Sequence, residues 1–272
     1  MNAPRIAAIQ LNSGADVAVN LTAARRALEQ ARRQQAVLAV LPENFAFMGA
    51  HERDKLAVAE AEGRGPIQEF LAATARALQL WIVAGTLPVK AAEAQRVAAA
   101  CLVFDAGGAR VARYDKIHLF DVEVPDGGTY RESASIAPGP LAPVVVDTPA
   151  GRLGLSVCYD LRFPELFREL ARQGAEVLAV PSAFTERTGE AHWETLLRAR
   201  AIENQCYVVA PGQYGEHPGA RRTWGHSLVV DPWGRVLAQQ PSGDGAIVAP
   251  LPREPLLELR RRFPVLNHRR LP

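Results

Sequence analysis

Short apolar runs alternate with longer amphipathic stretches along most of this chain. The short runs are rich in Val, Ile and Leu and are bounded by polar or turn-forming residues, which is typical of β-strands. We therefore predict strands over residues 6–11, 37–41, 81–85, 97–104, 109–114, 144–147, 153–157, 177–180, 207–210, 227–231, 235–239 and 246–251. Turn-forming residues at 105–108, 149–151 and 232–234 join three successive pairs of these strands, which predicts three hairpins.

The amphipathic stretches predict helices, because their apolar residues recur at helical spacing. They cover residues 20–35, 164–172 and 191–204, a stretch that begins at Pro66, and a terminal stretch near 254–262. Proline suits a first helical turn, where its missing N–H is not needed. In the helix that begins at Pro66, we expect Phe70, Ala73 and Ala77 to face inward.

Strand–helix units interspersed with hairpins predict an α/β protein in which mixed sheets are layered with helices. No low-complexity linker, abrupt change of composition or short repeat divides the sequence, so we expect one domain over residues 1–272. The pattern does not give the order of the strands. The long polar stretch over residues 116–143 predicts a functional or disordered loop.

The composition is that of an ordinary globular protein, with 48% hydrophobic and 22% charged residues. The formal net charge is +2, from 31 basic and 29 acidic side chains, which argues against a nucleic-acid or membrane partner over most of the surface. Basic residues crowd together near the end of the chain, at Arg260, Arg261, Arg262, His268, Arg269 and Arg270. We expect this tail, from about residue 255 to 272, to be solvated or to take part in contacts between subunits.

No apolar run reaches the length of a membrane-spanning helix, and the opening residues resemble a first strand rather than a secretory leader. The three cysteines are widely spaced and odd in number, so they do not make a disulfide framework. We therefore expect a cytoplasmic protein with reduced thiols.

Cys158 ends a predicted strand and lies just before a predicted helix, where active-site residues of α/β proteins gather. A helix N-terminus and a nearby cation such as Arg162 favour the thiolate, which is the nucleophilic form of cysteine. The alternative is a buried, inert thiol. Cys101 and Cys206 fit that alternative, because each adjoins an apolar strand.

Two further polar residues follow predicted strands in the same way. Glu43 lies beside apolar Phe45, so burial should raise its pKa toward the range that suits a general base, unless it is an ordinary capping or loop glutamate. Lys116 could oppose a developing oxyanion, although a lysine is more often a surface residue. Near it, His118 is the one histidine worth testing as a catalytic partner, and a structural hydrogen bond is the favoured interpretation.

Other catalytic patterns are missing from the sequence. It contains no Gly-x-Ser-x-Gly nucleophile elbow, no His-Glu-x-x-His or Cys-x-x-Cys zinc motif, and no glycine-rich phosphate loop. A serine triad, a zinc centre and a nucleotide site are therefore not expected. One nucleophile, one base and one cation remain, although no spacing rule makes that set diagnostic.

Three segments together resemble the nitrilase, or carbon–nitrogen hydrolase, superfamily. They are Leu41-Pro42-Glu43, Tyr114-Asp115-Lys116-Ile117-His118-Leu119, and a cysteine segment from Ser156 to Leu166, and they occur in the order that the family has. The resemblance covers nearly the whole chain. It implies a four-layer αββα sandwich, assembled as a homodimer or a larger homo-oligomer, with no cofactor and no metal.

The resemblance also implies a role for each residue. Cys158 would be the nucleophile, Glu43 the general base, and Lys116 the oxyanion stabiliser. The backbone N–H of Tyr159 would assist the lysine. A second glutamate in the loop after the lysine segment corresponds to Glu132 and would complete the catalytic set.

Later segments, at residues 181–194, 197–208 and 224–234, resemble the Nit branch of this family, which holds omega-amidases and deaminated glutathione amidases. Residues 200–208 and 261–270 are closer to the latter. The resemblance implies that Arg162 and Thr188 hold a substrate carboxylate, which agrees with the bidentate binding that a guanidinium offers. An ion pair of Arg162 with Asp160 or Glu165 is the alternative.

The resemblance therefore predicts an amidase that hydrolyses a small carboxylate-bearing amide, deaminated glutathione by the closest likeness, to an acid and ammonia through a cysteine thioester. An omega-amidase acting on α-ketoglutaramate is the nearest alternative. A nitrilase with the same catalytic residues and a non-catalytic binding member of the fold are the others. The expected partner is the small-molecule substrate, with no nucleic acid and no membrane.

Overall fold

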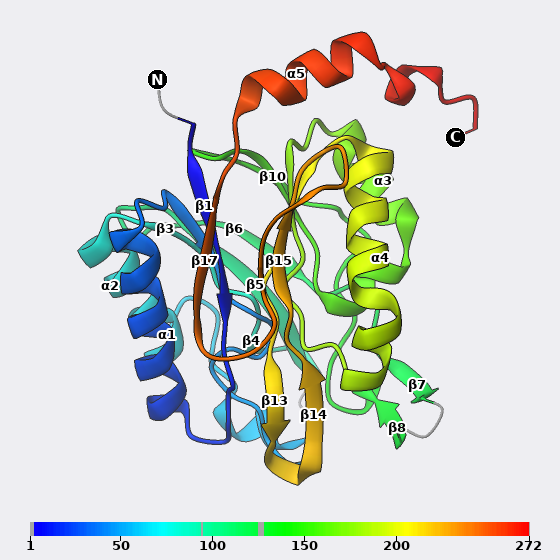
Figure 1. Ribbon diagram of the computed structural model, residues 1–272. Coiled ribbons are helices and arrows are strands. Elements are labelled where there is room, and N and C mark those ends of the chain that lie inside the picture. The colour runs from blue at the N-terminus through cyan, green and yellow to red at the C-terminus, as the bar shows by residue number, and fades with distance from the viewer. Residues whose placement is uncertain (1–2, 94, 125–127, 272) are drawn as a thin grey trace.

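The computed structural model describes residues 3–93, 95–124 and 128–271. Within these ranges, the strands form two large mixed sheets and two separate hairpins (Figure 1). The first large sheet has seven described strands: β17 (Gly245–Pro250), β1 (Arg5–Gln10), β2 (Leu38–Val40), β3 (Trp81–Val83), β5 (Val97–Phe104), β4 (Leu87–Lys90), and β6 (Arg110–Asp115), which pairs with β5. Its neighbours β1, β2 and β3 are parallel, and the pairings outside them are antiparallel.

The second large sheet repeats this plan. Its six described strands, in order across the sheet, are β16 (Val236–Gln240), β15 (Ser227–Val230), β12 (Tyr207–Ala210), β11 (Val177–Ala179), β10 (Gly151–Leu155) and β9 (Val145–Thr148). Again the central neighbours β10, β11 and β12 are parallel and the flanking strands are antiparallel. Each sheet therefore has a parallel centre, and side chains that follow such strands meet at one edge of the sheet.

Helices cover the outer face of each sheet, which gives four layers in the order helix, sheet, sheet, helix (Figure 1). The helices on the first sheet are α1 (Val17–Arg33) and α2 (Pro66–Leu78), and those on the second are α3 (Pro164–Arg172) and α4 (Glu186–Asn204). The last helix, α5 (Arg253–Arg262), extends beyond these layers toward the C-terminus. The predicted α/β class and αββα sandwich are confirmed.

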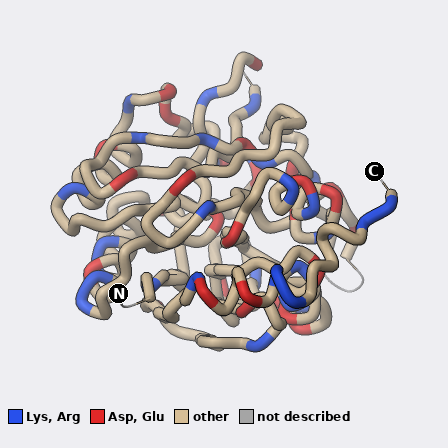
Figure 2. The backbone as a smooth tube through the Cα atoms, turned by 90° about the horizontal axis from the view of Figure 1, so that it is seen from above, with Lys and Arg blue, Asp and Glu red and all other residues tan. Residues whose placement is uncertain are grey.

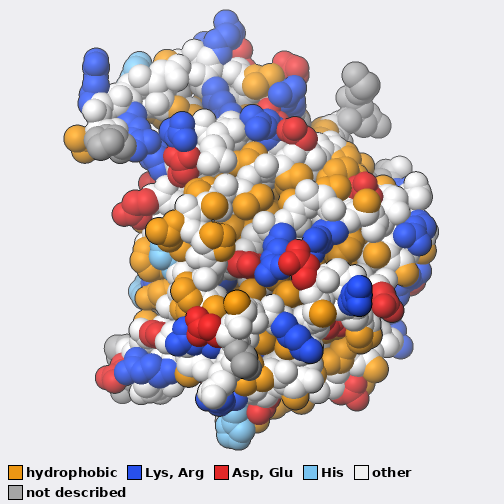
Figure 3. All heavy atoms as spheres, turned by 180° about the vertical axis from the view of Figure 1, so that it is seen from behind, with side chains coloured by type: hydrophobic (Ala, Val, Ile, Leu, Met, Phe, Trp, Pro, Cys, Tyr) orange, Lys and Arg blue, Asp and Glu red, His pale blue; other side chains and the backbone are white. Residues whose placement is uncertain are grey.

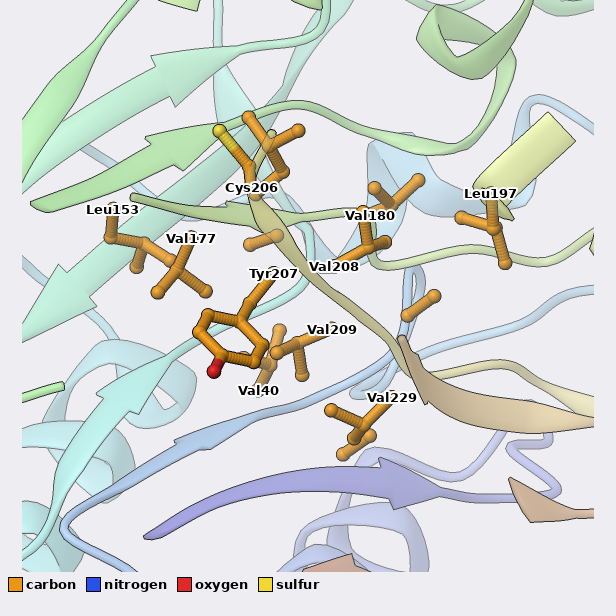
Figure 4. Close-up of a cluster of buried hydrophobic side chains, with 14 of the residues drawn as sticks. Val40, Leu153, Val177, Val180, Leu197, Cys206, Tyr207, Val208, Val209 and Val229 are labelled. Carbon is orange, nitrogen blue, oxygen red and sulfur yellow. The ribbon is translucent and has the colours of Figure 1, made fainter. Parts of the chain in front are cut away.

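The main core lies between the two sheets. In Figure 4, Val40 of the first sheet lies among side chains of the second, including Tyr207 and Val209. Because one face of each sheet meets the other sheet and the opposite face meets helices, the central strands are buried on both sides. All eight residues of β5 are buried, for example. This is why the strands appear in the sequence as continuous apolar runs rather than as alternating patterns.

Two helices begin earlier than their apolar periodicity predicts. The side chain of Asp16 accepts hydrogen bonds from the backbone N–H groups of Ala18 and Val19 and so begins α1. Thr185 caps α4 through the N–H of Thr188. The first turn of α4 is polar, and the first turn of α1 exposes Val19 and buries Asn20, so neither turn follows the apolar periodicity of its helix.

The predicted inward face of α2 is wrong for Ala73 and Ala77, although Phe70 is partly buried and packs against the core. Ala73 and Ala77 are exposed, whereas Ile67, Leu71 and Ala75 are buried against the first sheet. Alanine occupies both faces of this helix, so it carried little information about orientation. The large apolar residues Ile67 and Leu71 mark the buried face.

Five described strands fall where the sequence predicted none. They are β4 of the first large sheet and the four strands of two short hairpins outside the large sheets. The hairpins are β7 (Asp121–Val124) with β8 (Gly128–Arg131), and β13 (Tyr214–His217) with β14 (Arg221–Trp224). The first hairpin lies within the stretch 116–143, which we expected to be an irregular loop and of which residues 125–127 lie outside the described ranges. Both hairpins are short and polar, so they lack the apolar runs by which the other strands were found.

Charged positions of both signs are interspersed along the backbone when the molecule is viewed from above (Figure 2). The opposite face from Figure 1 shows the same mixture between apolar side chains, with basic side chains gathered over the C-terminal segment (Figure 3). In the described part of the chain, no helix combines the length and the apolar content that crossing a bilayer requires.

Candidate active site

One pocket brings together residues from distant parts of the sequence. Glu43, Lys116, Glu132 and Cys158 all line it. Glu43 follows the parallel strand β2, Lys116 follows β6, and Cys158 follows the parallel strand β10. The four residues predicted to form one catalytic set therefore share one cavity between the edges of the two sheets.

The local backbone holds Cys158 in a strained conformation. Its φ angle is 48°, in the left-handed region that a residue with a side chain rarely adopts. Cys158 begins the short 3-10 turn η3 (Cys158–Arg162), and its N–H donates to the carbonyl of Pro181 at 2.9 Å. One residue earlier, the N–H of Val157 donates to the carboxylate of Asp160 at 2.8 Å. These hydrogen bonds fix a sharp turn that directs the sulfur into the pocket, as strained backbone at functional sites does.

The Cys158 side chain is a protonated thiol rather than a thiolate. Burial raises the pKa of this thiol well above its ordinary value, and the negative charge of Glu43 raises it further. Lys116 acts in the opposite direction but does not offset these effects. The helix start and the cation, which favour a thiolate, do not outweigh desolvation beside a carboxylate, so the thiol keeps its proton. The sulfur needs a base to take its proton.

Lys116 is a buried cation held by two carboxylates. Its side chain is 2% exposed, and its Nζ lies 2.8 Å from Oε1 of Glu43 and 2.9 Å from both carboxylate oxygens of Glu132. Burial alone would lower the pKa of this ammonium, but the charges of Glu132 and Glu43 raise it well above the ordinary lysine value. The alternative of a surface lysine is excluded, and the charge is fixed inside the pocket.

Glu43 is buried and ionised rather than protonated. Burial by itself would raise its pKa, but the charge and hydrogen bond of Lys116, with a smaller effect of the Cys158 thiol, lower the pKa below its ordinary value. Our prediction of a raised pKa was therefore wrong, since the sequence did not reveal that the lysine would lie 2.8 Å away. Its second oxygen, Oε2, accepts the backbone N–H of Ala183 at 2.9 Å, which orients the carboxylate.

Glycine allows the strand that carries Glu43 to lie close to its neighbour. Gly85 follows β3 with a φ angle of 56°, and a Cβ atom there would collide with the carbonyl oxygen of Pro42. A larger residue would push apart the two chain segments just before Glu43.

Glu132 contacts the lysine with both oxygens. It lies in the turn η2 (Glu132–Ala134), and its Oε2 also accepts the N–H of Phe120 at 2.6 Å. A carboxylate engaged in this way is suited to hold Lys116 in place and to balance its charge, and less suited to carry protons.

His118 lies outside the pocket lining, so far as the described residues show. Its Nδ1 lies 2.7 Å from Asp160, and its ring stacks on Phe163 with centroids 3.7 Å apart. Asp160 also accepts the hydroxyl of Tyr114 at 2.7 Å. These contacts fit the structural role that we favoured for His118, because they brace the turn that carries Cys158.

Arg162 and Thr188 both line the pocket beside Cys158. The guanidinium of Arg162 lies over the rings of Phe184 and Tyr159, at 5.4 and 5.9 Å from their centroids. Among the described residues, no carboxylate pairs with it, so the predicted alternative of an ion pair with Asp160 or Glu165 does not hold. A cation without a carboxylate partner in an aromatic-walled pocket is available to bind an anion.

Several other residues that line the pocket were not predicted from the sequence. Lys55, Glu52 and Arg221 line it, together with the rings of Phe120 and Tyr130. Lys55 comes from the 3-10 turn η1 (Asp54–Val58) and Arg221 from strand β14. Neither element was predicted from the sequence, so no signal pointed to these side chains.

Cys101 and Cys206 are buried away from the pocket, which fits the inert role predicted for them. Burial raises the pKa of the Cys206 thiol to about 11, and it raises that of Cys101 further. Within the described ranges, no group of His, Cys, Asp and Glu residues is arranged to hold a metal ion.

Comparison with known proteins gives consistent matches. Residues 5–261 match the carbon-nitrogen hydrolase family. The chain is 46% identical over 265 residues to the deaminated glutathione amidase of Synechocystis, covering 97% of each chain. The crystal structure of the Caenorhabditis elegans NitFhit protein superposes with a TM-score of 0.90 and 41% identity over 99% of this chain, which spans 66% of that longer protein. A mutant amidase from Nesterenkonia sp. AN1, with acrylamide added at its active-site cysteine, has a TM-score of 0.79 and 29% identity and covers 96% of this chain and 98% of its own.

Proposed function

The chain belongs to the carbon–nitrogen hydrolase family and is an amide-hydrolysing enzyme, and we propose that it acts through a thioester on Cys158. One observation carries this proposal. A buried lysine bonded to two glutamates lies in the same pocket as a cysteine held on a strained turn. That set supplies a nucleophile, a base and a fixed cation, the parts needed for acyl transfer.

In the first half-reaction, the thiol of Cys158 transfers its proton to the carboxylate of Glu43 while the sulfur attacks the amide carbonyl carbon. The carbonyl oxygen gains negative charge, which the Lys116 ammonium and the backbone N–H of Tyr159 stabilise. A donor of this kind typically lowers the barrier by about 3–4 kcal/mol. The carbon–nitrogen bond then breaks, Glu43 protonates the departing nitrogen, and the acyl group remains on sulfur as a thioester.

In the second half-reaction, Glu43 takes a proton from a water molecule, whose oxygen attacks the thioester carbon. Lys116 stabilises the oxyanion again. The carbon–sulfur bond breaks, the sulfur recovers a proton from Glu43, and the carboxylic acid product leaves. Because the pKa of Glu43 is lowered, it is ready as a base at neutral pH. Throughout, Glu132 holds Lys116 in position.

For the substrate, we propose a carboxylate-bearing amide, and deaminated glutathione is the candidate favoured by the name of the 46% identical relative. Arg162 with Thr188 would bind a carboxylate on the acyl part of the substrate. The expected release of ammonia from this substrate needs correction on chemical grounds. Each amide nitrogen of deaminated glutathione carries a carbon substituent, so hydrolysis releases an amine and not ammonia.

An omega-amidase that acts on α-ketoglutaramate is the second candidate, because the same cation would hold its carboxylate. That primary amide would release ammonia. Comparing kcat/KM for the two substrates decides between them, and a nitrile assayed in parallel tests the nitrilase alternative.

The catalytic roles are tested by intact-mass spectrometry during turnover. The wild-type chain should gain the mass of the acyl group, and Cys158→Ala should gain none. We expect Glu43→Gln and Lys116→Ala to lose steady-state hydrolysis. Substantial hydrolysis by any of the three variants would contradict the role assigned to that residue, and a trapped acyl-enzyme would exclude the alternative of a non-catalytic binding protein.

We further propose that residues 1–272 form one hydrolase domain, of which residues 1, 2 and 272 lie outside the described ranges. We propose that the protein is cytoplasmic and assembles as a homodimer or a larger homo-oligomer. The segment from about 255 onward extends past the four layers and exposes Phe263 and Leu271, which suits contacts between subunits (Figure 1). Light scattering of the full chain and of a chain ending at residue 254 tests this. An unchanged mass after truncation would contradict a role of the tail in assembly. No nucleic-acid or membrane partner is proposed.

A further inference from the structure

A second pair of cations lines the pocket, apart from Lys116 and Arg162. They are Lys55 and Arg221, whose side chains are 15% and 25% exposed. Both contact the same carboxylate, since Lys55 Nζ lies 3.0 Å and Arg221 3.2 Å from oxygens of Glu52. Two positive charges against one negative charge leave this cluster with a net charge of about +1.

A row of aromatic rings runs from this cluster to Tyr159, the residue that follows the nucleophile. Tyr159 adjoins Cys158, and its ring lies 5.0 Å from that of Phe120. The Phe120 ring lies 5.1 Å from that of Tyr130, and the guanidinium of Arg221 lies over Tyr130 at 5.3 Å. Arg162, by contrast, lies against Tyr159 and Phe184. The pocket therefore has two cationic ends with the aromatic row between them, and Cys158 lines the same pocket.

The end at Arg221 continues into a second cleft. Asn44, Glu52, Lys55, Tyr130 and Arg221 line both cavities. Arg162, Thr188 and Cys158 line only the first of the two. A substrate whose acyl carboxylate is held at Arg162 would thus extend its leaving group past the sulfur toward Lys55 and Arg221.

The two cations keep donors for a ligand. In the described part of the chain, Arg221 uses one of its five N–H groups on Glu52 and Lys55 uses one of its three. A guanidinium and an ammonium placed side by side make a suitable seat for a carboxylate.

We propose that Lys55 and Arg221 form a leaving-group site that binds a carboxylate on the amine released by hydrolysis. This inference rests on the proposed function, because it concerns the other side of the bond that Cys158 attacks. It makes the enzyme selective for substituted amides with an anionic leaving group. A primary amide, which releases ammonia, has nothing to place in this site.

The test compares deaminated glutathione with its C-terminal carboxamide, in which the terminal carboxylate is neutral. The variants are Arg221→Gln and Lys55→Gln, and the readout is the ratio of kcat/KM for the acid to kcat/KM for the carboxamide. Losing one charge-assisted contact should lower this ratio about 10-fold to 100-fold. Arg222→Gln is the matched control, since Arg222 is the next residue of β14, is 54% exposed and pairs with Glu186.

The outcomes separate the two proposals. A wild-type preference for the acid that falls in both pocket variants, but not in Arg222→Gln, supports the leaving-group site. An equal loss of kcat/KM on both substrates would show that Arg221 and Lys55 are merely structural. The unfolding midpoints of the two variants would then be lowered as well. Equal wild-type rates on acid and carboxamide would overturn the leaving-group site but not the amidase. If the wild type hydrolysed α-ketoglutaramate but neither deaminated glutathione nor its carboxamide, the proposed substrate and this inference would both be overturned.

Discussion

The replacement Lys116→Met tests whether the buried lysine serves both folding and catalysis. It keeps the length of the side chain but removes an ammonium that contacts three carboxylate oxygens at 2.8 to 2.9 Å and is almost fully buried. Removing one partner of a buried ion pair typically costs about 3–5 kcal/mol, because the remaining charges lose their compensation. We expect a loss of that size in the free energy of unfolding at pH 7.

The pH dependence of this loss has a definite sign. In the wild type, the pKa of Glu43 is lowered, so Glu43 contributes stability above its ordinary pKa of 4.5, and that contribution is lost as the pH falls through the lowered value. Without the lysine, burial would raise the pKa of Glu43 above 4.5. The stability of Lys116→Met should therefore decrease as the pH rises from about 4.5 to 7, whereas the contribution of Glu43 in the wild type stays constant over that range. Urea unfolding at several pH values measures this directly.

A second variant separates stability from catalysis. Adding Glu132→Gln to Lys116→Met removes one of the two uncompensated carboxylates, so we expect it to recover part of the lost stability. Hydrolysis should stay reduced by about 100-fold to 1,000-fold, because the oxyanion still lacks its cation. Full recovery of kcat in the double variant would refute the reasoning, since it would mean that Lys116 only balances charge. An unfolding free energy of Lys116→Met within about 0.5 kcal/mol of the wild type would refute the buried-pair argument.

Three further predictions follow from single contacts. Because the pKa of Glu43 is lowered and that of Cys158 is raised, kcat/KM should be level between about pH 5.5 and 8.5. Alkylation of Cys158 by iodoacetamide should accelerate only above about pH 9. An alkylation rate that follows a thiolate titrating near pH 7 would contradict this. Asp16→Ala removes the cap of α1 and should lower the free energy of unfolding by about 1 kcal/mol in urea titrations, whereas no change would show that the cap is dispensable. Gly189→Ala places a Cβ against the side chain of Trp224 and should cost about 1–3 kcal/mol by the same measurement, and an unchanged midpoint would mean that the helix shifts freely.

Much of the fold was predictable, because burial on both faces leaves a local signature. Strands such as β5 and β12 have the predicted bounds, since each is a continuous apolar run between turn-forming residues. The short hairpins β7–β8 and β13–β14 were missed, because each buries little apolar surface and has no partner in the large sheets. Helix α3 was predicted with its observed bounds because Pro164 marks its first turn.

The candidate site likewise contains residues that the sequence predicted and residues that it did not. Cys158, Glu43 and Lys116 were singled out because each follows a strand, and the resemblance added Glu132, Arg162 and Thr188; all six line one pocket. Lys55 and Arg221 had no such signal. Strand ends reveal themselves through the apolar run before them, whereas a side chain on a polar turn or hairpin looks like any other surface residue.

By itself, the sequence determined the alternation of strands and helices, the two-sided burial of the central strands and the residue types available for chemistry, because these depend on short stretches of chain. Only the tertiary structure decided the protonation of the site. Glu43 and Lys116 are far apart in the sequence, and their 2.8 Å contact lowers the pKa of Glu43 where burial alone would have raised it. Electrostatic interactions depend on distance in space and on the exclusion of water, and neither quantity exists until the two sheets have packed together.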